Sequence, residues 1–229
     1  MSLQYLLAER TLAMAEEIAW QARDWDTLSR LYMPLQEARR QRRQRCGEGI
    51  VKLDLWAEGP DNHISAQHIL ENFPHGQLLV AGWGSLETAI QVRRLAAEQE
   101  LYVDTFLAAT YPDDSGRMIA IEPLADVEMP PTTLPSMHIL SRLRYHGMML
   151  HESELPRGMQ RGNPQTYGVV MALWERIHTP FLAAADSMSD PIMKIEAYRR
   201  VIQIDYACEL AHQKLADVAR QLCISPRSS

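Results

Sequence analysis

The sequence predicts an α+β fold in which helical hairpins at both ends flank a small mixed α/β sheet of about four strands. Three observations predict this architecture. At both ends of the chain, apolar residues recur every three or four positions, which is the spacing of one helix face. Between Ile50 and Leu124, apolar residues alternate with polar ones or form short runs, as they do in strands. The cluster Pro112–Gly116 has the chemistry of a tight turn, which predicts antiparallel strands on either side of it.

An N-terminal helical hairpin is expected at residues 1–47. Its first helix covers Leu3–Ala22, and the small residues on its apolar face permit a closely packed neighbour. Asp24 is the expected N-cap of the second helix, whose apolar stripe consists of Trp25, Leu28, Tyr32 and Leu35. Pro34 lies inside this helix, where its missing backbone donor predicts a bend. The helix ends in a basic turn before Gly47, which the helix dipole favours.

A small α/β domain is expected at residues 48–128. Asp61 or Asn62 is the expected cap of its first, short helix. Two strands joined by a helix predict a parallel pair, and the strand after the turn at Pro112–Gly116 is expected to return antiparallel. In chain order, the expected elements are a strand at 51–55, a helix at 66–73, a strand at 77–81, a helix at 86–99, and strands at 101–109 and 118–121.

The remaining chain is expected to form a connecting region at residues 129–166 and a C-terminal helical region at 167–229. Prolines and glycines punctuate the connection, with one helix expected from Ser136 to about His146. Asp190, Pro191 and Asp205 supply cap signals between the C-terminal helices. Four apolar sets have helical spacing there: Val170, Leu173, Trp174 and Ile177; Phe181, Leu182 and Ala185; Ile195, Tyr198 and Ile202; and Ala211, Leu215, Val218 and Leu222.

The helical ends share a spacing of large and small residues with a known repeat. At the C-terminus the matching positions are Lys194, Tyr198 and Val201 on one helix and His212, Leu215, Ala216 and Ala219 on the next. At the N-terminus they are Leu12, Ala15 and Ala19, followed by Leu28, Tyr32 and Leu35. This pattern resembles tetratricopeptide-repeat (TPR) hairpins. The resemblance implies that a protein or peptide binds on a concave helical face.

A glycine-rich turn is a candidate site for a small anionic ligand, such as a sugar phosphate or a nucleotide. The turn from Gly82 to Thr88 follows a strand and opens a helix, so its free N–H groups and the helix dipole could hold a phosphate. The candidate residues are Gly82, Gly84, Ser85 and Thr88, and the turn faintly resembles that of sugar-isomerase domains. Glu87 stands where a dinucleotide fingerprint has its third glycine. The alternative is an ordinary strand-to-helix turn capped by Ser85.

Two further groups of residues are weaker candidates. Glu209 and His212 are spaced as metal ligands on one helix, although a metal site also needs further ligands that converge on it. The alternative is a half-buried histidine that is hydrogen-bonded to a neighbour. The arginine run Arg39–Arg45 could contact phosphates or an acidic protein. The alternative favoured for this run is a solvated helix end.

The composition of the chain argues against several classes of function. The net charge of −6 over 229 residues argues against a general nucleic-acid binder, and no apolar stretch is long enough to span a bilayer. Three cysteines without a C-x-x-C pair fit a reducing compartment, so the cytoplasm is the expected location. No complete catalytic motif occurs, and no cofactor is expected. The sequence therefore predicts a non-catalytic protein-interaction or scaffold protein. The alternative is an α/β protein that binds a small anion at the Gly82–Thr88 turn.

Overall fold

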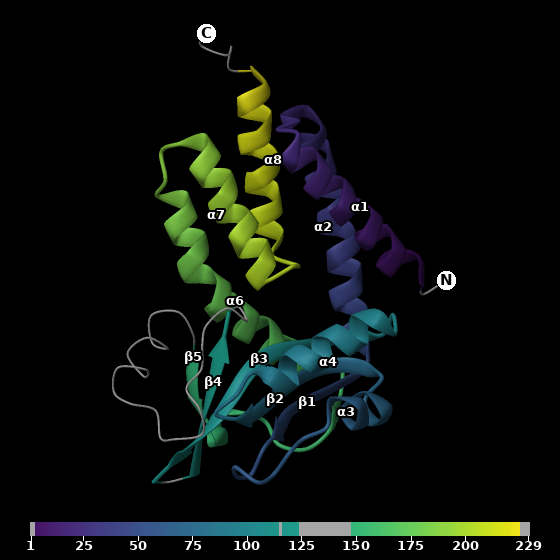
Figure 1. The fold of residues 1–229 in the computed structure, drawn as a ribbon, viewed down its shortest axis with the longest axis vertical. Helices are drawn as coiled ribbons and strands as arrows, with labels where there is room; N and C mark the ends of the chain where they lie inside the picture. The colour runs from purple at the N-terminus through teal and green to yellow at the C-terminus, as the bar shows by residue number, and fades with distance from the viewer. Residues whose placement is uncertain (1–2, 115, 124–147, 225–229) are drawn as a thin grey trace. The chain divides into compact units, whose positions relative to one another are not determined.

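The computed structural model describes residues 3–114, 116–123 and 148–224, and the chain divides into two compact units. The helical unit consists of Met1–Arg43 and His178–Ser229, and the sheet unit of Gln44–Ile177. The chain passes from one unit to the other within two helices, α2 (Trp25–Glu48) and α6 (Pro164–Asp186). The described residues form seven α-helices and one mixed sheet (Figure 1), so the predicted combination of end helices and a mixed sheet is confirmed.

The helical unit brings together helices from both ends of the chain. Its other elements are α1 (Leu3–Gln21), α7 (Pro191–Ile204) and α8 (Glu209–Ile224). Two of the predicted caps are confirmed: Asp24 accepts the Thr27 N–H (3.1 Å), and Asp190 accepts the backbone N–H groups of Ile192 and Met193. The helices share one core, formed by Ala19, Leu28, Tyr32, Ala185, Ile195, Tyr198, Val201, Ile202, Cys208, Ala211, Leu215, Ala216, Val218 and Ala219.

The sheet has six strands in the order β5-β4-β3-β2-β1-β6, so the expectation of about four is wrong. The strands are β1 (Ile50–Trp56), β2 (His75–Trp83), β3 (Tyr102–Asp113), β4 (Gly116–Glu122), β5 (Met148–His151) and β6 (Gln160–Arg161). The expected parallel pair, β2 with β3, and the antiparallel return of β4 are confirmed. The two additional strands are short edge strands within the segment predicted to be a connection. Both strands form by backbone pairing, β5 with β4 and β6 with β1. They are four and two residues long, which is too short for a periodic pattern in the sequence to predict them.

Helices cover both faces of the sheet. On one face, α3 (Ala66–Asn72) and α4 (Glu87–Glu98) bury an apolar core with β2, β3 and β4 (Figure 1). On the other face, the ring of Phe106 stacks on that of Trp174 from α6, with centroids 4.3 Å apart. The cap of α3 is Ser65, which accepts the His68 N–H, and not Asp61 or Asn62, because the helix begins three or four residues later than those caps require.

Two prolines lie inside helices that continue past them. The first two C-terminal stripes belong to the single helix α6, which runs through Pro180. Burial of Trp174 on one side of this proline and Ala185 on the other offsets the roughly 3 kcal/mol that an internal proline costs. Pro34 lies within α2, where the bend stays a prediction. The helix expected at 136–146 lies outside the described residues.

Candidate functional site

The Gly82–Thr88 turn joins β2 to α4, as predicted, and most of its geometry has a structural cause. Gly84 has a left-handed backbone (φ 58°), and its N–H donates to the Thr110 carbonyl at 2.9 Å. The Glu87 N–H donates to the Ser85 hydroxyl at 3.2 Å. A Cβ at position 82 would lie 2.7 Å from the Ser85 carbonyl oxygen, so close packing alone requires Gly82. The anion site stays a prediction, and two N–H groups of the turn, those of Gly84 and Glu87, already donate to acceptors within the chain.

A pocket of about 140 Å³ lies beside this turn, at the carboxyl ends of β1, β2 and β3. Small ligands of α/β proteins bind at this edge of the sheet, because loops from several strands converge there. The described residues that line the pocket are Glu58, Trp83, Pro112, Gly116, Arg117 and Glu152. Sequence analysis identified the turn and missed the pocket, because the other lining residues come from separate parts of the chain: Glu58 follows β1, Pro112, Gly116 and Arg117 belong to β3 and β4, and Glu152 follows β5.

Two carboxylates and one guanidinium give the pocket its charge. Arg117 pairs with Glu152 at 3.1 Å, and Arg157 pairs with the same carboxylate at 3.0 Å. Glu58 is exposed and makes no ion pair with any residue that the structure describes. An unpaired carboxylate next to the ring of Trp83 favours a cationic group, since both the carboxylate and the face of an aromatic ring attract positive charge.

The arginine run of α2 is largely buried, so the expectation of a solvated helix end is wrong for three of its members. The side chain of Arg43 is 2% exposed and that of Arg39 is 12% exposed. Glu9 of α1 pairs with Arg42 at 2.9 Å and with Arg39 at 3.6 Å, and Asp205 pairs with Arg43 at 2.5 Å. The two exposed arginines, Arg40 and Arg45, pair with glutamates three residues away on α2.

Asp205 lies at the centre of a buried cluster in the helical unit. It ends α7, as the predicted cap signal suggested, and it also accepts hydrogen bonds from Arg43, from His178 Nδ1 (2.7 Å) and from the Ala207 N–H (3.1 Å). Burial raises the pKa of Asp205, but the charge of Arg43 and the hydrogen bond from His178 lower it to about 2. Asp205 is therefore a buried anion held between two cations at neutral pH.

His178 is the second cation of this cluster. Burial lowers its pKa, but hydrogen bonds to Asp205 and Cys208 outweigh that effect and raise it to about 9. His178, Asp205 and Cys208 have potential metal-ligand atoms within 4.8 Å of one another. A metal-bound histidine must be neutral, however, and here a proton on His178 and the guanidinium of Arg43 already balance the carboxylate. Cys208 is 4% exposed, so this Cys–His pair offers no accessible nucleophile either.

Glu209 and His212, the pair with metal-ligand spacing, do not converge on a site. His212 is fully buried, and its ring nitrogens contact the Cys208 carbonyl (2.8 Å) and Arg39 Nη1 (3.0 Å). Burial, assisted by the charge of Arg39, lowers the pKa of His212 to about 4. A neutral ring can donate to the carbonyl from one nitrogen and accept from Arg39 with the other. Glu209 is exposed to solvent on α8.

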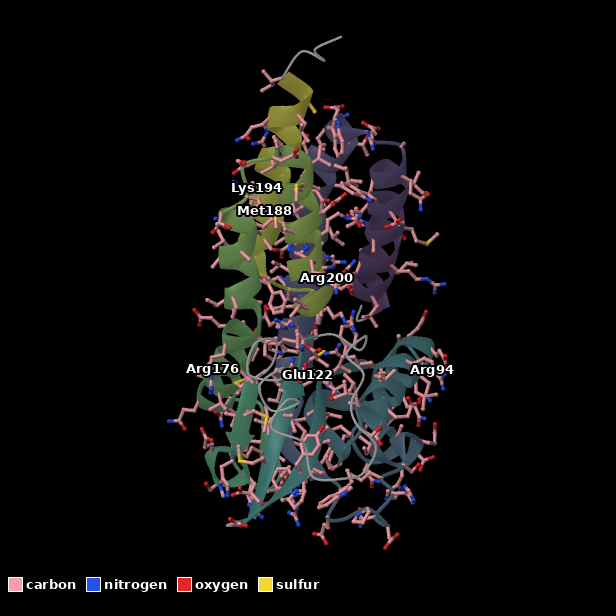
Figure 2. The ribbon with its side chains drawn as sticks, turned by 60° about the vertical axis from the view of Figure 1, so that its left-hand side comes forward. Arg94, Glu122, Arg176, Met188, Lys194 and Arg200 are labelled. Carbon is pink, nitrogen blue, oxygen red and sulfur yellow. The ribbon has the colours of Figure 1, made fainter. Side chains whose placement is uncertain are left out.

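The helix α1 has a mixed amphipathic arrangement, because carboxylates share its inward side with Ala19 and Trp20 while large apolar side chains lie on its outward side. Its inward face carries Glu9 and Glu16, and Glu16 is 7% exposed and accepts hydrogen bonds from Tyr32 (3.1 Å) and Arg199 (2.7 Å). Its outward face carries three large apolar side chains, Leu7, Met14 and Ile18, which are 66%, 61% and 66% exposed. Figure 2 shows side chains of α1 projecting on a side that no other helix of this unit covers.

We call Leu7, Thr11, Met14 and Ile18 the outward stripe of α1. Their spacing of four, three and four residues places them on one side of the helix, with Arg10 and Glu17 along one flank. Sequence analysis missed this surface, because the small residues of α1 were expected to form its packed face. Ala19 of that face is buried and Ala8 and Ala15 are only partly buried, so the packed face is shifted toward Glu9 and Glu16.

Comparisons with models of protein families, with curated protein sequences and with solved structures find no match. The resemblance to TPR hairpins stays a prediction. Among the described residues, no helix has the length and apolar character needed to cross a bilayer.

Proposed function

We propose that this chain is a non-catalytic protein-interaction protein whose helical unit binds another polypeptide through the outward stripe of α1. The observation that carries the proposal is the exposure of Leu7, Met14 and Ile18, each by more than 60%, on a helix that turns two of its three carboxylates inward. A helix that lies on a protein surface normally turns its apolar residues to the core. The exposure of these three apolar side chains is accounted for if a second polypeptide covers the outward stripe.

The energetics support docking at this surface. Full burial of a Leu, Ile or Met side chain stabilises by about 1.5–3 kcal/mol, and three such side chains lie here within three turns of one helix. Arg39, Arg42 and Arg199 hold Glu9 and Glu16 inward, so α1 cannot rotate its apolar side into the core without breaking these ion pairs. Contacts within the chain therefore fix the outward stripe toward solvent.

The non-catalytic part of the proposal rests on the buried polar groups of the helical unit. Asp205 has three hydrogen-bond donors, and both ring nitrogens of His212 have partners. These groups neutralise one another and do not line the pocket found in the sheet unit. Buried ion pairs of this kind hold helices in one arrangement, because a lost partner would leave a buried charge.

Photo-crosslinking tests the docking surface. A benzophenone amino acid replaces Met14 in the outward stripe, and in a matched control it replaces Gln203, which is exposed on α7. We expect irradiation of producing cells to link another polypeptide to position 14 and not to position 203, with the linked protein identified by mass spectrometry. Equal crosslinking at both positions, or none at position 14, would contradict the proposal.

A second candidate function is the binding of a small ligand in the pocket beside Trp83. The unpaired Glu58 and the adjacent ring favour a small amine over the anion predicted from the turn. Thermal-shift measurements with small amines, inorganic phosphate, sugar phosphates and nucleotides separate the two. Stabilisation by an amine that is lost in Glu58→Gln, but kept in the control Glu71→Gln on α3, supports the amine pocket. Stabilisation by phosphate that is lost in Gly84→Val supports the turn.

A further inference from the structure

We infer that the polypeptide covering the outward stripe of α1 is a second copy of this chain, with the two α1 helices packed antiparallel. This inference rests on the proposed function, whose docking surface it assigns to a partner. A two-fold axis makes a surface patch pack on itself, so the patch must be complementary to itself. The outward stripe and its charged flank meet that requirement.

The apolar residues of the stripe match in antiparallel register. With the axis midway between Thr11 and Met14, Leu7 of one copy lies opposite Ile18 of the other, and Thr11 lies opposite Met14. Alternating steps of four and three residues are the spacing of a coiled-coil seam. The Thr11 hydroxyl donates to the Leu7 carbonyl at 2.9 Å, so its hydrogen-bonding group is already satisfied within α1.

The flanking charges select the antiparallel orientation. Arg10 and Glu17 lie on the same side of the stripe, and both are exposed. In an antiparallel pair, equivalent flanks face each other, so Arg10 of each copy meets Glu17 of the other. In a parallel pair, this flank would face the opposite one, which carries Ala8 and Ala15. Opposite charges across the seam set partner and orientation in such helix pairs.

Both charges are available for this contact. Arg10 makes no ion pair within the part of the chain that the structure describes. Glu17 pairs with Arg199 at 2.7 Å yet keeps a side-chain exposure of 52%, so a second cation can approach it. A contact confined to one helix of each chain is small beside the about 1,600 Å² of a standard interface. We therefore expect a dimer that dissociates in the micromolar range.

Sedimentation equilibrium of the full chain over a range of concentrations provides the first test. The wild-type chain is expected to reach twice the monomer mass, and Met14→Glu to remain monomeric at every concentration. The matched control Met193→Glu replaces a methionine that is 56% exposed on α7 and is expected to dimerise as the wild type does. Circular dichroism checks that each variant retains its helices.

Charge reversal tests the orientation. Arg10→Glu places glutamates opposite each other at both ends of the seam, and Glu17→Arg does the same with arginines, so each variant alone is expected to dimerise about tenfold more weakly. An equimolar mixture restores opposite charges at both positions and is expected to recover dimer of wild-type stability. Weak association of the mixture, or unchanged association of each variant alone, would overturn the antiparallel arrangement.

The outcomes separate this inference from the proposed function. A wild-type chain that is monomeric at all concentrations overturns self-association, as does a dimer that Met14→Glu leaves intact. In either case, crosslinks from position 14 to a different, identified protein would leave the docking function standing. Absence of both the dimer and the crosslinks would overturn the two proposals together.

Discussion

Replacing His178 with glutamine should remove most of the pH dependence of helical-unit stability between pH 6 and pH 9.5. The pKa of His178 is about 9 in the folded chain, against an ordinary value of 6.5. A folded-state pKa above the unfolded value means that the protonated form stabilises the fold. This contribution is fully present below pH 6.5 and is lost as the pH rises through 9.

The size of the effect follows from the shift of the pKa. Each unit corresponds to about 1.4 kcal/mol, so the difference between the folded and ordinary values corresponds to about 3 kcal/mol. The His178 side chain is only 15% exposed, so solvent screens its hydrogen bond to Asp205 weakly. Glutamine can still donate to this carboxylate, but it carries no titrating proton.

Urea unfolding at pH 6 and pH 9.5, followed by hydrogen exchange of the α7 and α8 amides, measures the change. The free energy of unfolding of the wild type should fall by about 3 kcal/mol more than that of His178→Gln over this interval. His68→Gln is the matched control, because the His68 side chain is 77% exposed on α3. A wild type and a His178→Gln variant with the same pH dependence would refute the buried His178–Asp205 ion pair.

Four further substitutions test individual contacts by thermal or urea unfolding. Tyr32→Phe removes the buried hydroxyl that donates to Glu16 and should cost about 1–2 kcal/mol; no loss would mean that the bond is not formed. Gly162→Ala should destabilise the sheet unit by about 3 kcal/mol or more, since its Cβ would lie 1.7 Å from the Gly47 carbonyl oxygen. Gly168 lies in open space on α6, so Gly168→Ala should instead stabilise the fold by up to about 1 kcal/mol. If both glycine substitutions changed the free energy of unfolding in the same direction, the close packing at Gly162 would be contradicted. Asp190→Ala removes the N-cap of α7 and should cost about 1 kcal/mol, visible first as faster exchange at the start of that helix.

Elements whose signals are local could be predicted from the sequence. Asp24 and Asp190 cap helices where the sequence predicts, and the strands on either side of Pro112–Gly116 pair antiparallel. The Gly82–Thr88 turn joins a strand to a helix as expected. A cap, a turn or a periodic stripe acts within a few residues, so each leaves a readable pattern over a short window.

Which charged side chains are buried and which apolar ones are exposed depends on contacts that form only in the folded chain. Arg43 and Asp205 are 162 positions apart, so the sequence gives no sign that the charge of one neutralises the charge of the other. The pairing of Glu16 with Arg199 holds this carboxylate inward, while the large apolar side chains of Leu7, Met14 and Ile18 face outward. The strands β5 and β6 exist because existing edges pair with their backbones. The physical reason is common to all three: charge neutralisation and edge pairing join groups that are distant in the chain, and packing alone brings them within reach.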